Sequence, residues 1–410
     1  MSSLADKLKS LGVKTGTSHL PAPKPARHTI DSVVAGSFRA NSLGEVFVSE
    51  QAYGEDYLHG NRSPLPPSEG AFPLSLISQW ANDPRIAGLP LNKFAFLDTE
   101  TSGLSGGTGT YAFLVGAARF IDGKFVLRQF FMRDPAEEPA LLEELAHFLA
   151  PCEALVTFNG KSFDAPLLVT RYSLHRIPVP FKNYAHLDLL PLARRLWRDR
   201  LPSRALKYLE EHVLEFTRTS DETPGYEIPW LYFDYLRTGD ATPLAGVFYH
   251  NAMDVVAMSA LLHLVSEMTA NPYAGSVQHG LDFIALGKLF DDLGHWDAAA
   301  RLYERGLEFE LEEADFGVAV KRLSILQKRR GDLSQAVRLW EDAAKQGHIY
   351  AHIELAKHYE HKAKDVKSSI EWAISARTLT EQANLPAYVR VHWLEEIDHR
   401  LSRLQRKAGL

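Results

Sequence analysis

The sequence has very little cysteine and no surplus of positive charge. Its single cysteine, Cys152, excludes an internal disulfide framework and a zinc site built from cysteines. The net charge of -6 gives no overall attraction to a polyanion, so a nucleic-acid partner would need a local basic surface or bound metal. With 410 residues and 45% hydrophobic content, the chain is long enough for two or three domains with separate cores.

Long apolar runs are also missing. The opening residues, MSSLADKLKSLG, lack the apolar core of a signal peptide, and no apolar run approaches the length needed to span a membrane. We therefore expect a cytoplasmic protein with no membrane partner.

Composition divides the chain into three expected parts. Residues 1–89 are rich in proline, serine and glycine, which predicts a partly disordered N-terminal extension. Residues 90–270 alternate between strand and helix patterns, as in a mixed sheet flanked by helices, whereas residues 275–410 are helical throughout.

The first candidate site lies at the end of an apolar run, FAFLDTE. Side chains alternate faces along a strand, so Asp98 and Glu100 should emerge on the same side. Neighbouring carboxylates stay ionised at neutral pH only with positive charge between them, and their oxygens suit Mg²⁺ or Mn²⁺. A solvated exit from the strand is the alternative interpretation. The glycine-rich stretch 103–110 that follows lacks the Lys-Ser/Thr ending of a phosphate-binding loop.

A third acid, Asp164, follows later in the same region. Residues 111–120 and 124–133 predict a hairpin that turns at Asp122-Gly123, and residues 139–149 predict a helix. A strand over residues 154–158 then leads into a helix that begins near Asp164. An acid in the first turn of a helix is also favoured by the helix dipole, which is the structural alternative.

A long helix expected from Thr242 to Met268 carries two polar residues on its apolar stripe, His250 and Asp254. Positions four apart on a helix differ by only about 40° in direction, so these two side chains face the same way. Tyr249 is turned away from Asp254. A buried pair bonded to each other is the alternative, and the acids already found favour a functional site.

The region after residue 186 is basic. Residues 187–198 predict a helix with Asp188 as its N-cap, and Trp197 lies within the basic stretch. Its cations are Arg194, Arg195, Arg198, Arg200, Arg204 and Lys207. Such a stretch with an aromatic residue would suit a phosphate backbone and a stacked base, although a solvated basic face is the alternative.

The tail contains a weak internal repeat. Gly287, Phe290, Gly294, Ala299 and Tyr303 match the two-helix tetratricopeptide pattern. A second copy at residues 331–340 begins 37 residues after Gly294, and a weaker third copy covers residues 365–372. Stacked helix pairs of this kind predict a concave surface for a protein partner, with packing against the preceding domain as the alternative.

Taken in order, FLDTETSGL, FNGKSFDAPLL and HNAMDVVAM resemble the motifs of the DEDD superfamily of ribonuclease H-like 3′–5′ exonucleases. HLDLLPLARRLW and the helical tail make the resemblance closer to the YprB-type branch. This resemblance implies an α/β ribonuclease H-like domain over residues 90–270, with a mixed sheet flanked by helices. It also implies an all-α domain of tetratricopeptide-like helical repeats over residues 275–410.

The resemblance implies a two-metal site that holds two Mg²⁺ or Mn²⁺ ions. Its ligands would be Asp98, Glu100, Asp164 and Asp254, and its substrate contacts would be Thr99, Asn159, Arg194, Arg195 and Arg198. The implied activity is hydrolysis of phosphodiester bonds in single-stranded nucleic acid from the 3′ end. The alternatives are endonucleolytic cleavage, and a non-catalytic nucleic-acid-binding scaffold with a partner on its repeats.

The expected catalytic base departs from the family pattern. Better-known members carry Tyr four residues before the last Asp or His five residues before it, whereas this chain has His250 at four and Tyr249 at five. Helical geometry favours His250, because it faces Asp254, and an imidazole is the better proton acceptor near neutral pH. Tyr249 is the second candidate.

Overall fold

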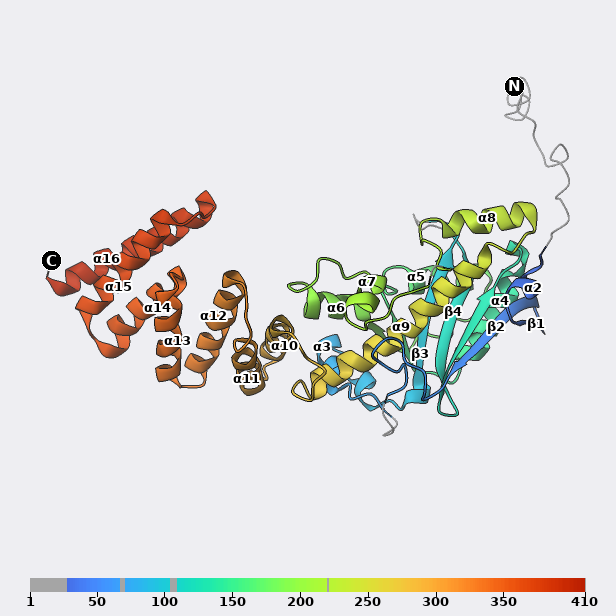
Figure 1. The fold of residues 1–410 in the computed structure, drawn as a ribbon, viewed down its shortest axis with the longest axis horizontal. Coiled ribbons are helices and arrows are strands. Elements are labelled where there is room, and N and C mark those ends of the chain that lie inside the picture. The colour runs from blue at the N-terminus through green and yellow to red at the C-terminus, as the bar shows by residue number, and fades with distance from the viewer. Residues whose placement is uncertain (1–27, 67–70, 104–108, 220, 410) are drawn as a thin grey trace, which may run out of the picture. The chain divides into compact units, whose positions relative to one another are not determined.

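The computed structural model describes residues 28–66, 71–103, 109–219 and 221–409, which form two compact units (Figure 1). The first unit comprises the described residues up to 74 together with residues 83–191 and 205–266. The second comprises residues 75–82, 192–204 and the described residues from 267 onward. Most of the glycine-rich stretch considered above as a phosphate loop lies outside the described residues.

A mixed sheet of seven strands forms the centre of the first unit, as the sequence predicted. Its strands are β1 (Ser37–Asn41), β2 (Gly44–Tyr53), β3 (Phe94–Thr101), β4 (Ala112–Ile121), β5 (Lys124–Phe131), β6 (Ala154–Thr157) and β7 (Ala185–Asp188). Their spatial order is β1-β2-β5-β4-β3-β6-β7. The pairs β3–β6 and β6–β7 are parallel and the other neighbours antiparallel. Asp122 and Gly123 join β4 to β5 with φ angles of 48° and 73°, as a tight hairpin requires.

Two parts of the sheet differ from the sequence prediction. The segment expected to be an N-terminal extension supplies β1 and β2, and β2 pairs along its length with β5. Its buried residues Val46, Phe47 and Val48 are consecutive, so β2 lacks the alternation that marks a strand in sequence. The four-residue strand β7 was not predicted, because so short a strand has no readable period. Its last residue, Asp188, is nevertheless the N-cap that was predicted: helix α6 (Leu189–Trp197) begins at the next residue, and Asp188 Oδ1 accepts a hydrogen bond from the backbone N–H of Leu190 at 3.1 Å.

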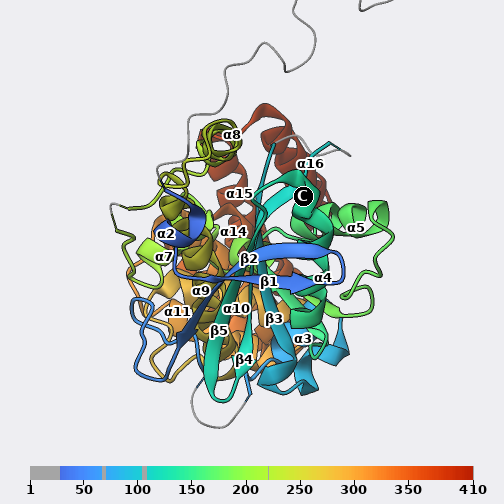
Figure 2. The ribbon, with the colours of Figure 1, turned by 90° about the vertical axis from the view of Figure 1, so that its right-hand side faces the viewer.

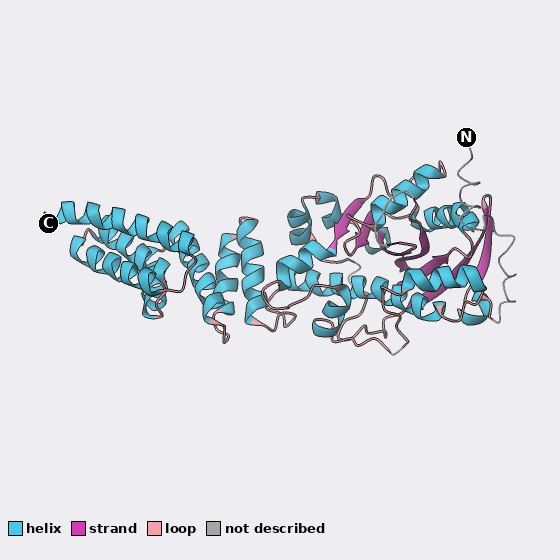
Figure 3. Cartoon of the chain, turned by 90° about the horizontal axis from the view of Figure 1, so that it is seen from above, coloured by secondary structure: helices cyan, strands magenta, loops and turns pink. Residues whose placement is uncertain are grey.

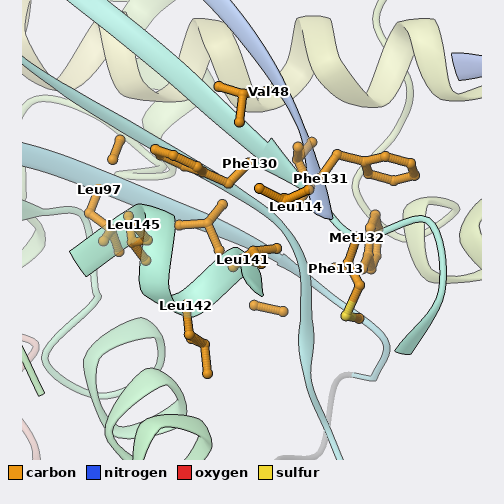
Figure 4. Close-up of a cluster of buried hydrophobic side chains, with 14 of the residues drawn as sticks. Val48, Leu97, Phe113, Leu114, Phe130, Phe131, Met132, Leu141, Leu142 and Leu145 are labelled. Carbon is orange, nitrogen blue, oxygen red and sulfur yellow. The ribbon is translucent and has the colours of Figure 1, made fainter. Parts of the chain in front are cut away.

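Helices cover both faces of this sheet. Helices α4 (Glu138–Leu149) and α5 (Asp164–Leu174) lie on one face, and α9 (Leu244–Ala270) lies on the other (Figure 2). Leu141 and Leu145 of α4 belong to the same buried cluster as Leu97 and Phe130 of the strands (Figure 4). The aromatic ring of Tyr232 on α8 (Ile228–Thr238) stacks on Phe113 of β4 with 4.0 Å between the ring centres.

Helix α9 is the long helix on the face of the sheet opposite α4 and α5. By length and composition it would be able to cross a membrane, but 89% of its most apolar window is buried inside the protein. Burial of this extent is typical of the core helix of a folded domain. The first unit also contains the short helices α2 (Ile30–Val33) and α7 (Leu206–His212) and the 3-10 turns η1 (Pro84–Gly88), η2 (Leu91–Lys93) and η3 (Pro135–Glu137). Helix α6 (Leu189–Trp197) begins in the first unit and continues into the second.

The described part of the second unit is helical, whereas every described strand belongs to the first unit (Figure 3). Its elements are α3 (Ser75–Ala81), α10 (Gly280–Asp292), α11 (Trp296–Gly306), α12 (Glu313–Arg329), α13 (Leu333–Lys345), α14 (Ile349–His358), the π-helical turn η4 (Tyr359–Ala363), α15 (Val366–Gln382) and α16 (Ala387–Ala408). From α10 onward each helix contacts the next. Tyr303 and Trp340, which the repeat pattern singled out, are buried in successive hydrophobic clusters.

Candidate active site

Strand β3 presents Asp98 and Glu100 on the face that α9 covers. Asp98 pairs with Gly116 on β4, and Asn251 of α9 donates a hydrogen bond to Asp98 Oδ2 at 2.9 Å. Gln129 of β5 donates in turn to Asn251 Oδ1 at 3.0 Å. A Cβ at Gly116 would lie 2.3 Å from Asn251 Oδ1, so only glycine leaves room for this amide. The uncharged amide of Asn251 therefore holds one carboxylate oxygen of Asp98 in place through a hydrogen bond.

Helix α9 brings His250 and Asp254 to these acids. His250 Nε2 lies 3.5 Å from Asp254 Oδ2 and 3.9 Å from Glu100 Oε1. The Tyr249 hydroxyl instead accepts a hydrogen bond from the backbone N–H of Thr219 at 3.1 Å. Of the two exchanged residues, His250 is therefore the one that contacts the acids.

Asp164 reaches the site from the start of α5. The Thr99 hydroxyl donates to Asp164 Oδ1 at 2.5 Å. Asn159 has a positive φ of 68°, and its backbone N–H donates to Asp188 Oδ1 at 2.7 Å. Thr99 therefore bonds one of the four acids directly, whereas Asn159 bonds Asp188, whose charge acts on Asp164.

The acids act strongly on one another. Burial raises the pKa of Asp98 well above its ordinary value, and the charges of Asp254, Asp164 and Glu100 add to the effect. Burial, followed by Asp254 and Asp164, raises the pKa of Glu100 to about 8. Burial raises the pKa of Asp164 to about 6, against the hydrogen bond from Thr99. Such a group needs a nearby cation before all its members can be ionised together.

Two residues that sequence reasoning missed, Arg218 and Glu222, complete the site from the segment between α7 and α8. The Arg218 guanidinium contacts Asp254 Oδ1, and its Nη1 donates to Glu222 Oε1 at 3.0 Å. Glu222 Oε1 lies 3.3 Å from His250 Nδ1. Gly246 of α9 permits this approach, because a Cβ there would lie 2.7 Å from the Asp221 carbonyl oxygen. Residues of a loop follow no helical or strand periodicity. The sequence signal for this pair was therefore limited to the spacing of four residues between the arginine and the glutamate.

The donor set is suited to a hard divalent cation. Among the described residues, no three Asp, Glu, His or Cys side chains are arranged as a formed metal site. Three of the carboxylates are instead turned toward hydrogen-bond donors, namely Asn251, Thr99 and Arg218. The chemistry nevertheless fits Mg²⁺ or Mn²⁺, since both take carboxylate oxygens and a cation would relieve the repulsion among these acids.

The five arginines of the predicted basic stretch belong to the second unit, whereas Lys207 belongs to the first, where it pairs with Glu222. Within the second unit, Arg195 pairs with Asp292, and Arg200 pairs with Asp282 at 2.8 Å. Arg198 lies 3.4 Å from Asp199, and Arg194 is exposed. Trp197 is fully buried, which makes the expectation of a base stacked on it wrong. The structure thus brings the four acids, Thr99 and His250 together, whereas Arg195 and Arg200 are engaged by acids of the second unit.

Comparisons with known proteins identify a family for this chain. Residues 95–266 match the RNase H superfamily. The uncharacterized protein YprB of Bacillus subtilis (strain 168) is 34% identical over 328 residues, which cover 78% of this chain and 76% of that protein. Among solved structures, the family B DNA polymerase from the hyperthermophilic archaeon Pyrobaculum calidifontis aligns with 50% of this chain at 15% identity and a TM-score of 0.32. The aligned part spans 30% of the length of that polymerase.

Proposed function

This chain belongs to the YprB family and contains a domain of the RNase H superfamily, and we propose that it is a cytoplasmic, metal-dependent nuclease. The proposed reaction is hydrolysis of phosphodiester bonds in single-stranded nucleic acid, from the 3′ end. The single observation that carries this proposal is the approach of Asp98, Glu100, Asp164 and Asp254 to one another, with His250 beside them.

The proposed ligands of Mg²⁺ or Mn²⁺ are the four carboxylates, and the family resemblance implies two ions. When bound, such ions stabilise the attacking and leaving oxygens of the phosphodiester displacement. His250 is the proposed general base, because its Nε2 faces Glu100 and Asp254 and an imidazole can accept a proton from the attacking water. Tyr249 is the second candidate.

The proposed substrate contacts have different neighbours. Thr99 is bonded to Asp164, and Asn159 is bonded to Asp188. Both residues are therefore proposed to contact the nucleic-acid strand next to the scissile bond. Arg194 and Arg198 are exposed and are proposed to contact phosphates, whereas Arg195 would have to exchange Asp292 for a phosphate.

A second candidate function, a non-catalytic scaffold, draws support from the second unit. A pocket of about 470 Å³ is lined by side chains of α12, α14 and α16, including Lys321, Tyr350, Ile353 and Trp393. The pocket combines apolar, aromatic and basic side chains, which suits a protein partner on the proposed tetratricopeptide-like repeats. An activity assay distinguishes the two functions, because a nuclease cleaves its substrate whereas a scaffold only binds it.

The deciding experiment is degradation of matched DNA and RNA oligonucleotides, each labelled at either end, with Mn²⁺ or Mg²⁺. We expect shortening from the 3′ end that EDTA prevents and that Asp98→Ala abolishes. Asp56→Ala, at an exposed acid of the first unit, is the matched control and should leave the rate unchanged. Full activity of Asp98→Ala, or activity in EDTA, would contradict a metal-dependent site. Binding without any cleavage would favour the scaffold.

A further inference from the structure

An open pocket of about 670 Å³ in the first unit is lined by α5, by the segment that leads to β7, and by β7 itself. Val169 of α5, together with Val179 and Phe181 of that segment, gives the pocket an apolar side. Phe181 is buried and packs edge-on against Tyr172, with 6.2 Å between the ring centres. The apolar side of the pocket is therefore held in place by the core of the first unit.

The charged part of the lining is basic. Lys161 and Lys182 are exposed, no acidic residue lines the pocket, and neither lysine forms an ion pair with an acid among the described residues. The charge of Lys161 acts on Asp83, but that carboxylate is already paired with Arg85 at 2.7 Å. Burial, aided by the charge of Lys161, lowers the pKa of His186 to about 4, so this imidazole is neutral at pH 7. The two lysines therefore give the pocket its positive charge.

The pocket adjoins the candidate active site along the chain. Asp164 begins α5, and the next residue, Ala165, lines the pocket. In the loop before α5, the backbone N–H groups of Asn159 and Lys161 both donate to the carboxylate of Asp188, at 2.7 Å and 3.1 Å. Asp188 on β7 therefore fixes the loop that joins the pocket to Asp164.

We propose that this pocket is a nucleotide subsite for the nucleic-acid strand whose end reaches the acids. One unpaired base lies against the apolar side, and the phosphates next to it contact Lys161 and Lys182. Apolar side chains suit the face of a base, and unpaired lysines suit phosphates. The subsite rests on the proposed function and deepens it, because a base that enters the pocket cannot be paired in a duplex.

The competing occupant is a peptide, because β7 is an edge strand of the sheet and an edge strand can pair with an added strand. Charge and position favour the nucleic acid. The two lysines complement phosphates, and they belong to the same unit as the acids, unlike the arginines of the predicted basic stretch.

The test is binding of a labelled single-stranded oligothymidylate to the full chain, measured by fluorescence anisotropy in EDTA over a range of salt concentrations. Lys161→Gln and Lys182→Gln should each weaken binding and reduce the slope of log affinity against log salt concentration by about 0.7, the share of one phosphate contact on a single strand. Lys161→Arg and Lys182→Arg keep the charge and should retain the wild-type slope. Lys124→Gln is the matched control, because this exposed lysine lies at the far end of the sheet from Glu100.

A second comparison tests the base. Val169→Asn makes one side of the pocket polar and should weaken binding of the oligothymidylate by roughly 2- to 30-fold. The same variant should bind an abasic strand of equal length as the wild type does, because that strand has no base to place in the pocket. Val169 is 40% exposed, so the fold should tolerate the change, which circular dichroism and the melting temperature verify.

The outcomes separate the subsite from the proposed function. Wild-type affinity and salt slope in both Lys→Gln variants would overturn the subsite and leave a metal-dependent nuclease standing. Equal losses for the oligothymidylate and the abasic strand in Val169→Asn would also overturn it, as would competition by thymidine monophosphate as strong as that by the oligothymidylate. Lysine-dependent binding without cleavage in Mn²⁺ would support the subsite and contradict the nuclease.

Discussion

His250 and Glu222 form a carboxylate–imidazole contact, with 3.3 Å between His250 Nδ1 and Glu222 Oε1. His250 Nδ1 is buried and makes no hydrogen bond to a described residue, so Glu222 acts on the ring through its charge, while the other nitrogen, Nε2, faces Asp254 and Glu100. Glu222 is in turn held by Arg218 and by Lys207. A residue from a loop thus acts on the proposed base on α9, and this relationship leads to the first prediction.

Glu222→Gln should lower the nuclease rate by roughly 10–100-fold, by analogy with the loss found when the outer partner of a metal-ligating histidine is removed. The rate is measured with the labelled oligonucleotide at saturating Mn²⁺. Glu211→Gln, at an exposed acid on α7, is the control and should behave as the wild type. An unchanged rate in Glu222→Gln, with the fold intact, would show that His250 needs no such partner.

The choice of base predicts unequal effects at the two exchanged positions. His250→Ala should reduce the rate by roughly 10²–10⁴-fold, the range for loss of a positioned general base. Tyr249→Phe should have a small effect, because the hydroxyl it removes accepts the backbone N–H of Thr219 and does not contact the acids among the described residues. The two variants are compared under single-turnover conditions. A larger loss in Tyr249→Phe would reverse the assignment.

Gly116→Ala should destabilise the first unit. The new methyl group would overlap the Asn251 amide that bonds Asp98, and such overpacking costs roughly 1–3 kcal/mol in the free energy of unfolding. Urea unfolding measures this change. Gly54→Ala is the matched control, since no atom lies within 4 Å of its added Cβ. Equal stability of the two variants would argue against a close contact between Gly116 and Asn251.

The second unit offers a prediction about pH. Glu360 lies 2.8 Å from Arg400, 2.6 Å from Arg403 and 2.7 Å from Lys407. Burial acts to raise its pKa, but the bonds from Arg403 and Lys407 outweigh burial and lower the pKa from 4.5 to about 2. A lowered pKa stabilises the fold above the unfolded value near 4.5, and this stability is lost as pH falls toward 2.

The measurement is thermal unfolding of the wild type and Glu360→Gln across this pH range. We expect the variant to melt at a lower temperature at pH 5–7 and the difference to shrink as pH falls toward 2. A difference that stays constant with pH would mean that the charge of Glu360 does not stabilise α16. Glu371→Gln, at an exposed acid on α15, is the control and should melt as the wild type does at every pH.

Local chemistry was sufficient to predict several parts of the fold. The turn at Asp122-Gly123 and the long helix α9 follow from residue preferences and periodicity over a few turns of chain. The spacing of Asp98 and Glu100 predicts a shared face because alternation is a property of every strand. The four-residue spacing of His250 and Asp254 works in the same way for a helix.

Other features were decided only by the tertiary structure. β2 is a strand because it pairs with β5, and Trp197 is buried although it lies in a stretch of basic residues. The positions of Arg218 and Glu222 depend on a loop that packs against α9, where neither residue follows a helical or strand period. The sequence by itself determined which acids are available and which way each points within its own element. Only the packing of separate elements decided that one of those acids, Asp254, is paired with a buried arginine, because contacts between distant segments leave no local pattern.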